Sequence, residues 1–148
     1  MTNWNDFGNR FKRDRAQAHA ETQLAAQKQA AVQQGQADFW QNLRNTALNA
    51  VNGVNQAANE KILLFHEDIV TSVQFEIIYP RAEQRRAAIV KLRGDVHTIE
   101  INAEGIVGWS QKQFQIQAGY QNHLEFVGAQ NRIYSPDAVI ELVLSMLL

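Results

Sequence analysis

The sequence predicts an α+β fold, in which a helical N-terminal region precedes a β-rich body that ends in one helix. The composition changes near residue 60, because every Ile, every Tyr and both Pro residues lie after it. Beyond that point, apolar residues alternate with polar ones in short segments separated by turn residues. The last residues are almost entirely apolar and follow a helix-start signal. We therefore assign residues 1–60 to a helical N-terminal extension and residues 61–148 to an antiparallel β-rich body with a C-terminal helix.

The composition excludes several functional classes. A chain of 148 residues can bury a core without disulfides or metals. It contains no Cys, which excludes thiolate nucleophiles, iron–sulfur clusters and cysteine-based zinc sites. The formal net charge of −1 provides no overall attraction to nucleic acid or anionic membranes. Because no secretory or transmembrane segment is recognisable, we expect a soluble cytoplasmic protein, and we expect no cofactor.

Two helices are expected in the N-terminal region, at about 10–34 and 38–60. The first consists mostly of strong helix formers, and Gly35 is expected to end it. It has few large aliphatic residues, so we expect it either to project or to pair with a partner helix. Asp38 has the position of a capping residue for the second helix. That helix carries an apolar stripe, which must be buried and which includes Trp40, Leu43, Val51 and Val54.

The body is expected to contain six or seven short strands. Alternation or turn spacing places them at residues 73–79, 88–93, 97–101, 106–109, 114–117, 124–126 and 132–134, with turns that include residues 81–84 and 102–105. Consecutive short strands favour an antiparallel meander, curled or folded into a sandwich. The order of strands followed by one helix resembles the pleckstrin-homology-like superfold. An open antiparallel sheet with helices on one face is the alternative.

The C-terminal segment predicts a helix that must be covered on most sides. Ser135 is a capping residue, Pro136 suits the first helical position, and Asp137 places a negative charge in the first turn. From residue 138 to 148 the segment is apolar nearly all round. We expect the sheet and the helix at 38–60 to cover part of it. The remainder, including Leu144 and Leu147, is a candidate dimer surface.

Few residues indicate catalytic chemistry. His97 is in phase with Ile99 and Ile101, so it is expected to point into the core. His66, Glu67 and Asp68 are adjacent, diverge in any regular structure, and are interpreted as a polar junction. No serine nucleophile elbow or phosphate loop occurs, and no metal site is expected. If a pocket lies between sheet and helices, the side chains predicted to line it are Tyr79, His97 and Trp109.

The first fifteen residues contain an aromatic face. In a helix, Trp4, Phe7 and Phe11 lie on one side, and the basic residues Arg10, Lys12 and Arg13 spread around the other. This pattern suits docking onto the chain's own body or a second copy, a groove on another protein, a membrane surface or a nucleic acid.

The leading hypothesis is a non-enzymatic protein–protein interaction or oligomerisation module, most simply a homo-oligomer. Its expected interaction surface combines the N-terminal aromatic face, the helical stripe and the C-terminal helix: Trp4, Phe7, Phe11, Trp40, Leu43, Val51, Val54, Leu144 and Leu147. One alternative is a small-ligand-binding or enzymatic domain with a pocket between sheet and helices. Another is peripheral binding to a membrane or nucleic acid through the basic and aromatic N-terminus.

Overall fold

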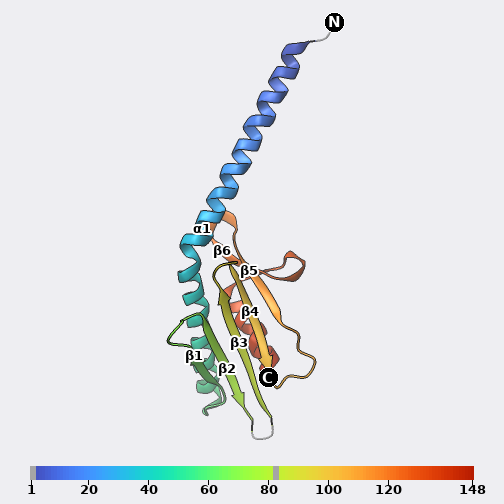
Figure 1. Ribbon diagram of the computed structural model, residues 1–148. Coiled ribbons are helices and arrows are strands. Elements are labelled where there is room, and N and C mark those ends of the chain that lie inside the picture. Colours follow the sequence, from blue (N-terminus) through green and yellow to red (C-terminus); the bar gives the residue numbers. More distant parts are fainter. Residues whose placement is uncertain (1–2, 82–83) are drawn as a thin grey trace.

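The computed structural model describes residues 3–81 and 84–148, and it confirms the α+β class (Figure 1). Helix α1 spans Trp4–Ala58, and helix α2 spans Pro136–Leu147. Between them lie strands β1 (Leu64–Glu67), β2 (Gln74–Pro80), β3 (Arg85–Arg93), β4 (Thr98–Glu104), β5 (Lys112–Ala118), β6 (Leu124–Val127) and β7 (Ile133–Tyr134). They form one antiparallel sheet in sequence order. Because β1 and β7 are its two edges, the sheet is open, which was the alternative to a sandwich.

The sheet has one apolar face and one polar face. The register aligns Phe75 of β2, Val90 of β3 and Ile101 of β4 across neighbouring strands, and all three side chains are buried. On the other face, the glutamines of β5 at positions 113, 115 and 117 are exposed. This alternation is the pattern expected of an antiparallel sheet that is packed on one side and solvated on the other.

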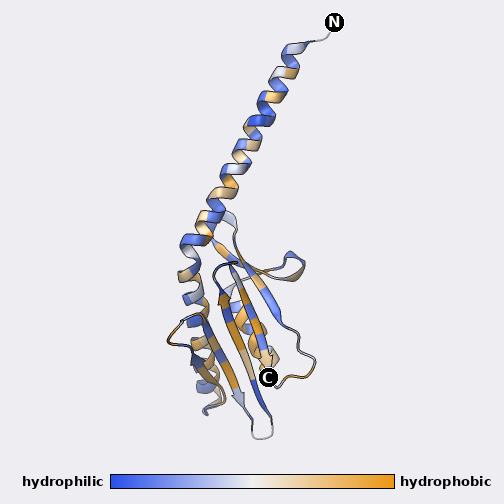
Figure 2. Cartoon of the chain, viewed as in Figure 1, coloured by the Kyte–Doolittle hydropathy of each residue, from blue (hydrophilic) through white to orange (hydrophobic). Residues whose placement is uncertain are grey.

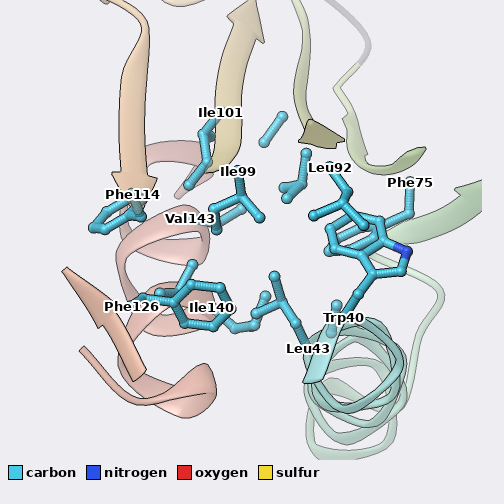
Figure 3. Close-up of a cluster of buried hydrophobic side chains, with 14 of the residues drawn as sticks. Trp40, Leu43, Phe75, Leu92, Ile99, Ile101, Phe114, Phe126, Ile140 and Val143 are labelled. Atoms are coloured by element: carbon cyan, nitrogen blue, oxygen red, sulfur yellow. The ribbon is translucent and has the colours of Figure 1, made fainter. Parts of the chain in front are cut away.

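A single hydrophobic core joins α1, the sheet and α2 (Figure 3). The Phe39 ring of α1 stacks on Phe126 of β6 at a centroid distance of 4.4 Å. Trp40 of α1 lies 5.3 Å from Phe75 of β2, between ring centroids. Val143 of α2 is also buried in this cluster. Helices α1 and α2 therefore pack on the same face of the sheet, and α1 covers part of α2, as the sequence predicted.

The predicted break between two N-terminal helices is wrong, because α1 continues without interruption through Gly35. Buried residues lie on both sides of this position, at Val32 and Trp40, so tertiary packing offsets the roughly 1 kcal/mol that Gly costs in a helix. A Cβ atom at Gly35 would lie 3.0 Å from Leu124 Cδ1. The glycine therefore allows close approach to β6. Asp38 is an exposed residue within the helix and caps nothing.

Strand β1 was missed by the sequence analysis, which treated the segment as a junction. Helix α1 ends at Asn59, which adopts a left-handed conformation with φ of 54°. The Asn55 side chain then holds the departing chain, since Oδ1 accepts from the Ile62 and Leu63 N–H groups at 2.9 and 2.8 Å. Asn55 Nδ2 also donates to the Leu63 carbonyl. These contacts direct a short apolar segment, which has no alternation of its own, onto the edge of β2.

The predicted strand at 106–109 is also wrong, since these residues form a loop between β4 and β5. Gly105 has φ of 75°, and a Cβ there would lie 2.1 Å from the Arg85 carbonyl oxygen. Gly108 also has a positive φ, of 77°. The left-handed conformations at Gly105 and Gly108 turn the chain out of the ladder, and pairing with β4 resumes only at Lys112. The predicted turn at 81–84 includes residues 82–83, which lie outside the described residues.

The C-terminal helix begins as predicted. Ser135 Oγ accepts the Ala138 N–H at 3.2 Å, and Pro136 lies in the first turn. The helix buries one face in the core: Val139, Ile140, Val143 and Leu147. Leu144 remains half-buried and Leu148 is 63% exposed. The helix is therefore covered on the side of the sheet and of α1, with apolar surface left beside them.

Replacing Leu43 with Ala is expected to lower the free energy of unfolding by about 2–5 kcal/mol, because this side chain is fully buried. Leu24 is the matched control on the same helix, and it is 51% exposed. The Leu24→Ala variant should stay within about 0.5 kcal/mol of the parent. Urea denaturation followed by circular dichroism measures both, and equal losses would contradict the placement of the core.

Candidate interaction surface

The first half of α1 projects from the body into solvent (Figures 1 and 2). Every described residue from Asn3 to Ala30 is exposed, and the first buried residue of the helix is Val32. We call residues 4–30 the arm. At 1.5 Å per residue it is about 40 Å long. The projecting alternative considered for the first helix is therefore the one observed.

Local interactions favour the helical conformation of the arm. The Asn3 side chain accepts the Asn5 N–H at 3.1 Å, which caps the helix, and Asp6 lies in the first turn. Gln17 donates to Glu21 across one turn at 3.3 Å. The remaining residues are mostly Ala, Gln, Lys and Arg, which have high helix propensity. The arm is thus maintained by propensity, capping and its continuity with the buried half of α1.

Three aromatic residues form an exposed cluster at the end of the arm, which we call the aromatic tip. Trp4 and Phe11 are 74% and 73% exposed, and Phe7 lies between them. The Trp4 and Phe7 rings lie 5.9 Å apart between centroids. The Arg10 guanidinium lies 5.8 Å from the centre of the Phe7 ring, so a cation borders the cluster. Large side chains exposed together in this way are typical of interaction surfaces.

The structure corrects the rest of the expected interaction surface. Four of the expected residues are buried within the single chain, in the core between α1, α2 and the sheet: Trp40, Leu43, Val51 and Leu147. The Trp40 indole N–H also donates to the Ser72 carbonyl at 2.7 Å. Val54 and Leu144 are only half-buried. The helical stripe therefore serves the protein's own core, and of the expected set only the tip is freely exposed.

A groove lies between α1 and α2, with a volume of about 530 Å³. We call it the α1–α2 groove, and it is lined by Thr46, Asn49 and Ala50 of α1 and by Asp137, Ile140, Glu141 and Leu144 of α2. Its charged lining residues are both acidic. Leu148, four residues beyond Leu144, extends the apolar edge by one turn.

The sequence analysis did not identify this groove. It interpreted Asp137 only as a first-turn charge and assigned no role to Glu141. The sequence signal that could have indicated the groove is a spacing of four residues. Asp137 and Glu141 form one row on α2. An apolar row lies beside it: Ile140, Leu144 and Leu148. Which of these rows faces a neighbouring helix depends on how α1 and α2 pack.

The three predicted pocket residues do not come together. Tyr79 lies next to the last residue of β2, and Trp109 lies in the loop after β4, so both are at one end of the sheet. His97 lies in the β3–β4 turn at the other end. The prediction that His97 points into the core from a strand is wrong. This residue lies in a turn with φ of 51°, and its side chain is only half-buried. Its Nδ1 contacts the Gln36 side chain of α1. Arg81 lies over the Tyr79 ring.

The acidic residues beside His66 have structural partners. Arg44 of α1 donates to both Glu67 carboxylate oxygens, at 2.7 and 2.6 Å, and this hydrogen bonding holds the pKa of Glu67 below its ordinary value. The Asp68 carboxylate accepts the Thr71 hydroxyl at 2.7 Å, which lowers the pKa of Asp68. His66 is exposed. All three residues nevertheless line one pocket beside β2, so the divergence expected from the sequence is not observed there. Arg44 and Thr71, rather than His66, hold the two carboxylates.

In residues 3–81 and 84–148, no group of three or more His, Asp or Glu side chains could hold a metal ion. In the same residues, no helix is both long and apolar enough to cross a membrane. Comparisons with models of protein families, with curated proteins and with solved structures each find no match for the chain.

The Arg44–Glu67 pair is expected to make stability depend on acidity. Because the folded-state pKa of Glu67 is depressed, the pair contributes fully above the unfolded value of about 4.3. This contribution is lost as the pH falls through the folded pKa. The Glu67→Gln variant should be less stable at pH 7 and should lose less stability on acidification than the parent. The matched control is Glu60→Gln, which alters an exposed residue at the end of α1.

The measurement is the free energy of unfolding by urea at a series of pH values. Parallel curves for the parent and Glu67→Gln would contradict the predicted role of the ion pair.

Proposed function

We propose that this protein is a non-catalytic association module that forms homo-oligomers through the aromatic tip of its arm. The observation that carries this proposal is the position of the tip. Trp4, Phe7 and Phe11 are exposed at the far end of a helix whose other half is anchored in the core. Each aromatic side chain can bury about 150–250 Å² in a contact, so the tip provides a compact source of binding energy.

The anchoring of the arm lowers the cost of association. Nucleation is the unfavourable step in forming a helix, and the arm avoids it because it continues a helix whose second half is already fixed. Binding a partner then orders few additional backbone torsions, and preorganisation of this kind increases affinity.

The charge distribution favours a second copy as the partner. Residues 1–59 carry six basic and four acidic side chains, whereas residues 60–148 carry eight basic and eleven acidic ones. The arm of one copy is therefore electrostatically complementary to the body of another. The ligand-binding alternative has less support, because its three predicted residues are divided between opposite ends of the sheet.

Light scattering at tens of micromolar is expected to give a mass of at least two chains of 16.8 kDa. Substituting Trp4, Phe7 and Phe11 together with Ser should reduce the mass to that of one chain. The matched control substitutes three exposed apolar residues of the body, Ile69, Val70 and Val107, with Ser and should leave the mass unchanged. A monomeric parent, or a tip variant that associates as well as the parent, would refute the proposal.

A further inference from the structure

We infer that the α1–α2 groove is the surface on which the aromatic tip of a second copy docks. This inference rests on the proposed self-association and names the receiving site. The groove is made by Thr46, Asn49 and Ala50 on one helix and by Ile140 and Leu144 on the other, together with Asp137 and Glu141. It adjoins the part of α2 in which Leu144 is only half-buried and Leu148 is exposed.

The tip cannot occupy the groove of its own chain. Trp4 and Thr46 belong to one uninterrupted α-helix, and 42 residue steps separate them along its axis by about 60 Å. The helix contains no Pro, and its glycines at positions 8, 35 and 53 all retain helical geometry. An arm of this kind reaches away from its own body, so the tip that fills the groove must belong to another copy.

The two surfaces match in their spacing. Trp4, Phe7 and Phe11 follow the i, i+3, i+7 pattern with which a helix lays one face into a groove between two others. On the receiving side, Ala50 provides a small residue against which a large ring can pack, and Leu144 borders the same space. The docked tip would lie against α1 and α2 as a third helix.

The two surfaces also match in charge. Asp137 and Glu141, which are the charged residues lining the groove, are both acidic. On the tip, the Arg10 guanidinium borders the aromatic cluster, 5.8 Å from the centre of the Phe7 ring. Opposite charges at the rim of an apolar contact steer association and fix its orientation, although exposed pairs add only about 0.2–1 kcal/mol each. The aromatic rings therefore provide the affinity, and the rim charges select the orientation.

A symmetric dimer would use the contact twice. Burying most of three aromatic side chains removes on the order of 400 Å² from the tip. In a two-fold pair each copy both donates a tip and receives one, so this burial occurs at two equivalent sites.

The absence of Cys makes a cross-linking test direct. Gly8 lies within the tip, where an added Cβ atom would meet open space, and Asn49 is an exposed residue that lines the groove. A mixture of the Gly8→Cys and Asn49→Cys proteins, oxidised mildly, is expected to form a disulfide-linked dimer of the two variants. The control pairs Gly8→Cys with Gln113→Cys, an exposed residue on the polar face of the sheet, away from the groove.

A second measurement uses charge reversal. Glu141→Arg should raise the dissociation constant of the dimer about tenfold, and adding Arg10→Glu to the same chain should recover most of that loss. Equal cross-linking of the groove and control pairs, or no recovery in the double variant, would overturn the inference.

These outcomes separate the inference from the proposed function. If the parent associates and the tip variant does not, but the groove pair fails to cross-link above the control, then the proposed function stands and the groove assignment is wrong. If the parent is monomeric, both are wrong.

Discussion

Burial of one face of α1 against the sheet and α2 is the interaction on which the rest of the structure depends. Trp40, Leu43 and Val51 fill the space between the two helices and the apolar side of the strands. Because the helix is continuous, this packing also fixes the direction of the arm, whose residues 4–30 are all exposed. A helix that was polar throughout would lack the apolar face that packs against the body and holds the helix in one orientation. The core and the exposed tip are therefore two consequences of one packed helix.

Local sequence patterns predicted the features that local interactions determine. The fold class, the alternation of β5 and the capped start of α2 at Ser135 each follow from spacing or from a hydrogen bond within a few residues. The misjudged elements depend on distant contacts. Gly35 remains helical because its neighbours along α1 are buried against the sheet. Gly105, whose backbone lies against the Arg85 carbonyl oxygen, begins the left-handed turn that takes residues 106–109 out of the ladder. Strand β1 requires Asn55 of the preceding helix to direct it.

The same distinction applies to the candidate surface. The sequence left open whether Trp4, Phe7 and Phe11 dock onto the chain's own body or onto a partner, and only the direction of α1 leaves them exposed. Burial of Trp40 and Leu43 within one chain was open in the same way, because an amphipathic stripe specifies that a partner exists without specifying whether it is the same chain or another. The groove beside Leu144 was also beyond sequence reasoning, since it is created only when α1 and α2 lie side by side.

The length of α1 has a consequence for how the molecule moves in water. A compact body with a rigid strut of about 40 Å has a larger hydrodynamic radius than a sphere of equal mass. A single chain consequently elutes early from a sizing column and tumbles anisotropically, and it imitates a heavier globular particle. Because the fold is elongated, its elution volume corresponds to a larger mass than the chain has. Elution volume alone therefore overestimates the number of chains in a particle.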